Sequence, residues 1–208
     1  MLELFDKIKA NPGTYGMQVQ AQQNVAVVVD KIKDMVNNFE VFLEAPLPLY
    51  YHTKQLNHHT VFDLIGWLFS VCGDTPAGAT RSNFYYPLIA LFSVFTRLAA
   101  GDGNDEPQMV EAAWFTQDVA GQPVTRVVIG ANLDDNVGER RAEKDITRVA
   151  RAQMMIDVGM MQADWIDESF VSAPTSSGGG GGGGGKRRAL AQLFGHCAEA
   201  LPFLYLES

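Results

Sequence analysis

Two strongly apolar runs, residues 61–72 and 84–95, limit what this 208-residue chain can fold into. Each run has about 12 residues, short of the roughly 20 that a helix needs to span a bilayer. Asp63 interrupts the first run and Ser93 the second. We therefore predict two buried core helices, at residues 61–72 and 83–100, that the rest of the chain must cover. A membrane hairpin is the alternative.

The clearest periodic signal runs over residues 18–43, where apolar residues recur at three- and four-residue steps. This pattern predicts a long amphipathic helix. Its apolar stripe is wider than a coiled-coil seam, so packing on a core is favoured over a coiled coil or a partner-docking helix. A short helix is expected before it, at residues 2–10. Pro46 and Pro48 should end the long helix, and residues 47–57 should form a loop.

Local signals predict three further elements. Thr60 is followed three residues later by Asp63, the spacing of a capping box at a helix start. Residues 110–119 and 124–129 are rich in aromatic and β-branched side chains, and the turn sequence between them predicts one β-hairpin. No other β structure is expected, so the hairpin should pack on helices. Another helix is expected at residues 138–170.

These elements predict a mainly α (α+β) fold, a helical core of roughly five to six helices with one β-hairpin packed against it. Residues 1–171 should form a single domain with its hairpin near 110–129. Residues 172–185 are a Ser/Gly-rich tract that ends in eight consecutive glycines. Such a tract is a flexible chain, either native, engineered or a stand-in for a disordered loop. Residues 186–208 should form an amphipathic helix that docks on the core or on a partner.

Charge and cysteine content limit the function classes. The formal net charge of −8 argues against a nucleic-acid binder, which needs clustered Lys and Arg. We expect a protein partner in a multiprotein complex, no nucleic acid and no membrane insertion. The two cysteines, Cys72 and Cys197, are interpreted as buried thiols, with a disulfide between them as the alternative. The first residues lack a secretory pattern, so a cytoplasmic location is expected.

No residue pattern predicts catalysis, a cofactor or a metal. His52, His58 and His59 are close in sequence, but adjacent histidines diverge on a helix or strand and make a poor metal site. The adjacent pair His196 and Cys197 likewise diverges, which argues against a nucleophilic pair. Glycine-rich phosphate-binding motifs are missing from the sequence. We therefore expect no catalytic residue, no cofactor and no metal.

With no site chemistry, the function is expected to lie in surfaces. We interpret the chain as a non-catalytic adaptor or chaperone-like protein, for example an accessory subunit of a bacterial secretion system or other multiprotein assembly. One alternative is a helical small-ligand-binding protein or enzyme with a pocket near Tyr50, Tyr51, His52 and His58. Another is a viral or phage structural protein. The candidate partner-binding residues lie on the last helix and on the hairpin: Leu190, Leu193, Phe194, Leu201, Trp114 and Thr125.

Overall fold

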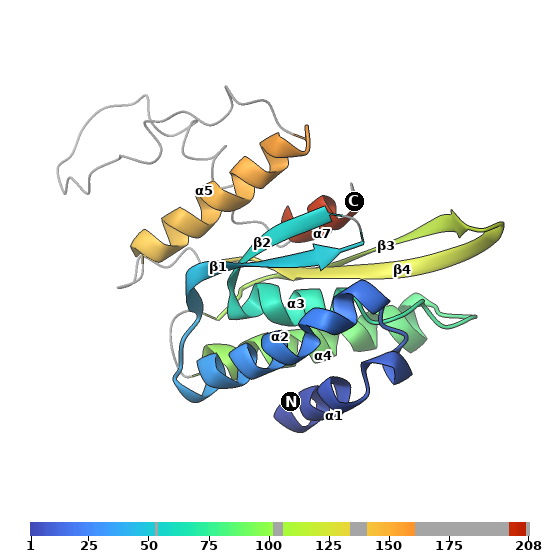
Figure 1. Ribbon diagram of the computed structural model, residues 1–208, viewed down its shortest axis with the longest axis horizontal. Helices are drawn as coiled ribbons and strands as arrows, with labels where there is room; N and C mark the ends of the chain where they lie inside the picture. The colour runs from blue at the N-terminus through green and yellow to red at the C-terminus, as the bar shows by residue number, and fades with distance from the viewer. Residues whose placement is uncertain (53, 102–105, 134–140, 161–199, 207–208) are drawn as a thin grey trace.

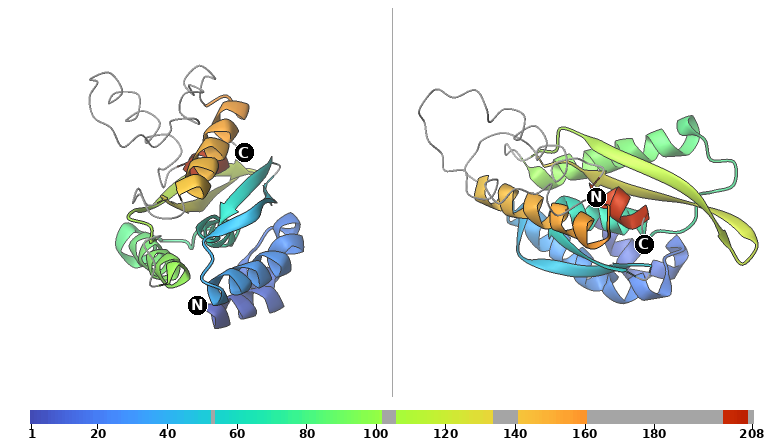
Figure 2. Two further views of the ribbon diagram at one scale, coloured as in Figure 1. Left: turned by 90° about the vertical axis from the view of Figure 1, so that its left-hand side faces the viewer. Right: turned by 90° about the horizontal axis from the view of Figure 1, so that it is seen from above.

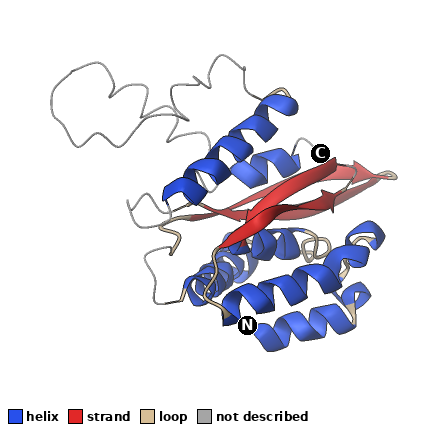
Figure 3. Cartoon of the chain, turned by 60° about the vertical axis from the view of Figure 1, so that its left-hand side comes forward, coloured by secondary structure: helices blue, strands red, loops and turns tan. Residues whose placement is uncertain are grey.

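The computed structural model describes residues 1–52, 54–101, 106–133, 141–160 and 200–206. It is an α+β fold with a helical majority, as predicted, but it contains two antiparallel hairpins instead of one. The hairpins form a middle layer, with helices α1 to α4 on one side and α5 and α7 on the other (Figures 1 and 3). The core lies between the hairpins and the first group of helices.

The N-terminal helices follow the predicted periodicity. Helix α1 spans Leu2–Ala10, and α2 spans Val19–Asn37 after a 3-10 turn at Pro12–Tyr15. Helix α2 ends before the predicted limit at residue 43, because Phe42 already begins a strand. Its apolar face is buried throughout, with the side chains of Ala21, Val25, Val28, Val29, Ile32 and Met35 in the core.

The predicted loop at residues 47–57 is wrong, because this segment forms a hairpin. Strand β1 spans Phe42–Tyr51 and pairs with β2, Lys54–Thr60, with an irregularity between Phe42 and Leu47. Pro46 and Pro48 lie within β1. Proline is tolerated in an edge strand, where it interrupts no second ladder of hydrogen bonds. Pro46 and Pro48 therefore protect the edge of β1 against pairing with another strand, and they do not indicate a loop.

Helix α3, Val61–Ser70, is the buried centre that the sequence predicted. It begins with the predicted capping box, in which Thr60 and Asp63 bond to each other's backbone N–H groups. The indole of Trp67 donates to the carbonyl of Tyr50 on β1 (2.9 Å). At its end, Ser70 Oγ accepts from the N–H of Ile129 (3.1 Å) on the second hairpin. Helix α3 thereby joins both hairpins.

Helix α4, Tyr86–Ala100, is not covered all round, which corrects the prediction of a second fully buried helix. It follows a π-helical turn at Arg81–Tyr85. One face, including Phe92 and Phe95, packs into the core. Because α4 lies at the outside of its layer (Figure 2), the opposite face is open in the described part of the chain. That face exposes Tyr86, Leu91, Val94 and Leu98.

The second hairpin confirms the predicted strands. Strand β3, Val110–Val119, pairs in continuous register with β4, Gln122–Ala131. The turn residues Ala120 and Gly121 have φ angles of 54° and 80°, as required by the tight turns that match strand twist. The turn end of the hairpin extends beyond the helices (Figure 1). Its other end packs on α3 through buried Val128 and Ile129.

Two helices cover the opposite side of the hairpins. Helix α5, Arg141–Asp157, contacts β2 and lies within the predicted helix at residues 138–170. It ends earlier than predicted, because a turn follows in which Gly159 has a φ of 79°. Helix α7, Ala200–Leu206, contacts α5 and β4, and it buries Leu204 and Tyr205 completely. The predicted glycine tract and most of the predicted last helix fall within residues 161–199, outside the described residues.

Candidate functional site

Asp63 and Arg151 form a buried ion pair between α3 and α5. Arg151 Nη2 lies 2.5 Å from Asp63 Oδ1, and the two side chains are 1% and 2% exposed. The other carboxylate oxygen accepts from the N–H groups of His59 (2.8 Å) and Thr60 (3.0 Å). Burial raises the pKa of Asp63, but the charge of Arg151 and the other neighbours bring it below its usual value. The carboxylate is thus paired and closed to solvent, which favours a structural function.

His58 is buried against Tyr205 of α7. Its Nδ1 lies 3.0 Å from the carbonyl oxygen of Leu56, and its Nε2 lies 2.7 Å from the Tyr205 hydroxyl. A carbonyl can only accept, so Nδ1 carries the proton and Nε2 accepts from the tyrosine. Burial lowers the pKa of His58 to about 4. The ring is therefore neutral near pH 7 and connects β2 to α7.

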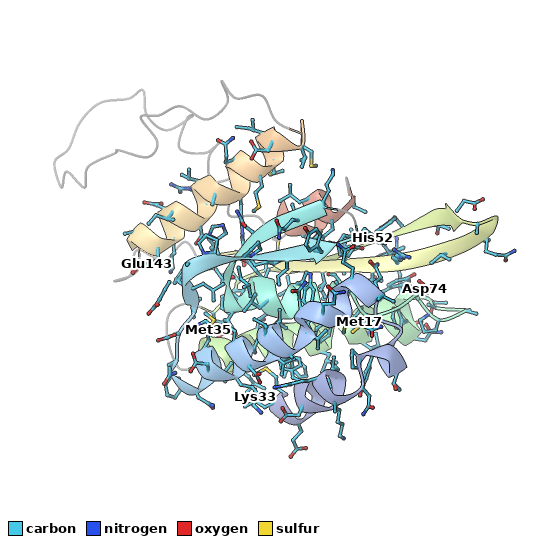
Figure 4. All side chains as sticks on the ribbon, in the orientation of Figure 1. Met17, Lys33, Met35, His52, Asp74 and Glu143 are labelled. Carbon is cyan, nitrogen blue, oxygen red and sulfur yellow. The ribbon has the colours of Figure 1, made fainter. Side chains whose placement is uncertain are left out.

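His52 lies at the turn of the first hairpin, where its ring packs edge-on against Tyr51 (centroids 4.7 Å). Its ring hydrogen-bonds to Arg126 of β4, and Gln18 Nε2 lies 3.2 Å from its Nε2. Arg126 also lies 3.6 Å from the carboxylate of Asp74, which Figure 4 shows on the same side of the molecule as His52. Burial lowers the pKa of His52, and the charge of Arg126 adds to this effect. The histidine therefore acts as a neutral link between segments.

Three of the four residues of the pocket alternative are linked by ring contacts. His52 packs against Tyr51 (centroids 4.7 Å), and both Tyr51 and His58 contact Tyr205 of α7. The backbone carbonyl of Tyr50 accepts a hydrogen bond from Trp67 of α3, and the ring of Tyr51 packs on Tyr205 with centroids 4.4 Å apart. Within the described ranges, His, Cys, Asp and Glu side chains form no group of three that could hold a metal ion.

Cys72 is not placed as a nucleophile. Its thiol donates to the carbonyl of Leu68 (3.1 Å), and burial raises its pKa to about 11. A thiol with that pKa remains protonated near pH 7 and reacts slowly. The other cysteine, Cys197, lies outside the described residues, as does His196.

The structure describes two of the six candidate partner-binding side chains. Leu190, Leu193 and Phe194 fall outside the described residues, and Leu201 lies in α7 with its side chain undescribed. Trp114 of β3 is 39% exposed, and its ring stacks on Tyr85 with centroids 4.3 Å apart. The hydroxyl of Thr125, on β4, lies 2.8 Å from that of Thr116 across the hairpin.

The outer edge of β4 is covered by the chain itself. The carbonyl of Thr125 accepts from the N–H of Thr75 (2.8 Å), in the segment that follows α3. The N–H of Ile129 donates to Ser70 of α3. Thr125 and Ile129 therefore direct their backbone groups away from β3 and toward the core. This edge leaves little space for another strand at these positions.

Among the described residues, no strand pairs with the outer edge of β3. Ala112 lies opposite Ile129, and Thr116 lies opposite Thr125. Residues that face each other in such positions of an antiparallel pair both point their N–H and C=O groups outward. Ala112, Trp114 and Thr116 therefore present backbone donors and acceptors along this edge. In the part of the chain that the structure describes, these groups have no hydrogen-bond partner.

Sequence reasoning missed the exposed face of α4, which adjoins this edge through the stacked Tyr85 and Trp114. An almost uniformly apolar helix predicts burial on every side. The sequence does contain a pattern that indicates this face, because Pro87, Leu91, Val94 and Leu98 follow one another at steps of four, three and four residues. That spacing is typical of a helix–helix seam.

Comparisons with known proteins add no assignment. No family model, no curated protein and no solved structure matches this chain. None of the described helices is long and apolar enough to cross a membrane. The geometry of the chain's own surfaces is therefore the guide to its function.

Proposed function

We propose that this chain is a non-catalytic interaction protein of the adaptor type, which binds an extended segment of a partner protein at the outer edge of β3. In this mode the incoming segment adds a strand and takes its affinity from main-chain hydrogen bonds. The observation that carries the proposal is the row of outward N–H and C=O groups on Ala112, Trp114 and Thr116.

The outer strands of the two hairpins differ in how they are protected against pairing with another strand, which supports the β3 edge as the binding site. Natural proteins protect an open edge with prolines, bulges or charges. Strand β1 has two prolines, Pro46 and Pro48, and an irregular register. Strand β3 pairs in regular register over its whole length, and the outward residues at its middle, Ala112, Trp114 and Thr116, are uncharged. The same alternation places Asp118 outward near the turn. The protection present on the first hairpin is thus missing where a partner strand would bind.

Trp114 supplies a means of selecting the partner. Its ring is held by stacking on Tyr85, so little conformational freedom is lost when a partner side chain packs on it. A partner strand beside β3 would place an apolar or aromatic side chain next to this ring. Because the net charge of the chain is −8, a segment that also carries basic residues is favoured. The expected partner segment is therefore extended, apolar at one position and basic overall.

The first experiment measures amide hydrogen exchange with and without a partner captured by the tagged protein from the cells that produce it. Strand addition should slow exchange at Ala112, Trp114 and Thr116. Their neighbours Ala113 and Phe115 point their N–H groups toward β4, so they should be protected already. A stoichiometric partner that leaves the three outward amides unprotected would contradict the proposal.

Two proline variants separate binding at the β3 edge from the stability of the hairpin. Ala112→Pro removes an outward N–H and should abolish partner capture while the chain stays folded. The matched control is Ala113→Pro, which removes an N–H from the ladder and should destabilise the hairpin itself. If Ala112→Pro folds normally and still captures the partner with unchanged affinity, the β3 edge is not the binding site. Retention of a small molecule in place of a protein would favour the ligand-binding alternative.

A further inference from the structure

The exposed face of α4 is a second surface, next to the β3 edge but formed by different residues. Leu91 is 39% exposed, Val94 53% and Leu98 55%, and exposed Pro87 continues their line toward the start of the helix. Steps of four, three and four residues place these side chains in one narrow row along the helix. Such a row is the pattern with which one helix packs along another.

This face lacks the composition of a helix surface that water covers. Solvated faces carry charged and polar residues, yet Arg97 is the one charged residue of α4. The exposed apolar row is therefore suited to a partner helix with a similar apolar row. A partner with a strongly charged face would find only Arg97 on α4, and Arg97 already lies 3.5 Å from Glu106.

We propose that the partner on this face is a second copy of the same chain, with the two α4 helices antiparallel. A two-fold axis between Leu91 and Val94 places Leu91 of each copy against Val94 of the other. The same axis places Pro87 of each copy against Leu98 of the other. The row is thus complementary to itself, which is what a symmetric dimer interface requires.

The charges at the two ends of α4 favour the antiparallel arrangement. Arg81 lies at the start of the turn that leads into α4. At the other end of α4, Arg97 forms an ion pair with Glu106 (3.5 Å). In the sequence, Asp102 and Asp105 add two acidic residues beside Glu106. Antiparallel packing brings the basic end of one copy to the acidic end of the other, and it also opposes the helix dipoles. Parallel packing would bring Arg81 against Arg81.

The expected dimer is reversible. One pair of helices of this length buries an area at the small end of specific interfaces, so the dimer should form in a concentration-dependent way. Sedimentation equilibrium of the full chain, from low micromolar to several hundred micromolar, should show a monomer–dimer equilibrium. Val94→Lys, which puts like charges into the row, should weaken association at least about tenfold.

The matched control is Val27→Lys on α2. Val27 is 56% exposed and Val94 53%, so the two substitutions change the same residue type at the same exposure in two helices. Val27→Lys should leave association unchanged. A wild-type chain that stays monomeric throughout would overturn the inference, and so would a dimer that both variants weaken equally.

Disulfide trapping tests the orientation. Leu91→Cys and Val94→Cys are made in separate chains of different tag length, both with Cys72→Ser and Cys197→Ser. Antiparallel packing predicts that a mixture oxidises to the mixed Leu91→Cys/Val94→Cys dimer. Disulfides formed only within each variant would indicate parallel packing and overturn the inference. Partner protection of the β3 amides is measured separately on Val94→Lys, so a failure here leaves the proposed function standing.

Discussion

The carboxylate of Asp63 lies 2.5 Å from the guanidinium of Arg151, and this buried contact joins α3 to α5. Removing one partner of such a pair leaves an uncompensated charge without solvent, which typically costs about 3–5 kcal/mol. We therefore expect Arg151→Met to lower the free energy of unfolding by about that amount. Urea denaturation followed by circular dichroism measures the change.

A surface ion pair provides the control for this prediction. Lys33 and Asp6 lie 2.8 Å apart, with side chains 33% and 51% exposed. Solvent screens such pairs, so Lys33→Met should change stability by less than about 1 kcal/mol. If Arg151→Met and Lys33→Met lost the same free energy of unfolding, the buried pair would contribute no more to stability than the surface pair.

The stability of the protein should fall in mild acid because of His58. Its pKa is lowered from 6.5 to about 4, so the fold favours the neutral ring. The stabilising effect is full above pH 6.5 and is lost as the pH falls from 6.5 through 4, by roughly 3 kcal/mol in total. His58→Gln keeps a side chain that can accept from Tyr205 but does not titrate. Its stability should therefore depend less on pH over this range.

Other titratable side chains also contribute to the pH dependence of stability. The pKa values of His52 and His59 are also lowered, so His58→Gln should flatten the profile in part. Asp63 has a lowered pKa too, and its contribution is lost only at more acidic pH, as the carboxylate is protonated. A profile for His58→Gln that is parallel to the wild type between pH 6.5 and 4 would argue against a buried neutral ring.

The two apolar helices should respond differently to one substitution. Leu64 of α3 is 0% exposed, whereas Leu91 of α4 is 39% exposed. Leu64→Asp buries an unpaired charge and should prevent folding, since its cost approaches the whole stability of a domain. Leu91→Asp should remain soluble and folded. Solubility and thermal melting of both variants decide this, and two unfolded proteins would show that the α4 face is covered.

Gly66 should resist even the smallest side chain. A Cβ at this position would lie 2.8 Å from the carbonyl oxygen of Ile129, a backbone atom that cannot move aside freely. We expect Gly66→Ala to cost about 1–3 kcal/mol as α3 and β4 are forced apart. Gly13→Ala, where a Cβ meets nothing within 4 Å, is the control and should be nearly neutral. If Gly66→Ala and Gly13→Ala shifted the denaturation midpoint equally, α3 and β4 would not approach each other closely at Gly66.

Local patterns predicted the elements whose signals lie within a few residues. Thr60 and Asp63 form the expected capping box, because each bonds to a backbone group of the same helical turn. The hairpin of β3 and β4 was predicted from its bulky alternation and turn sequence. The first hairpin was missed, because Pro46 and Pro48 forbid a helix as readily as they mark an edge strand. Which of the two applies depends on neighbours that sequence spacing does not identify.

The sequence by itself determined the helices, one hairpin and the need for a buried core, since propensity, capping and periodicity are local properties. Only the tertiary structure decided which apolar and charged groups the core accepts. Asp63 caps its own helix by a local rule, but its partner Arg151 comes from a segment 88 residues away. Likewise the exposure of Leu91 and the open edge at Trp114 depend on where the other elements pack. Burial and pairing are set by distant segments, so local patterns alone do not determine them.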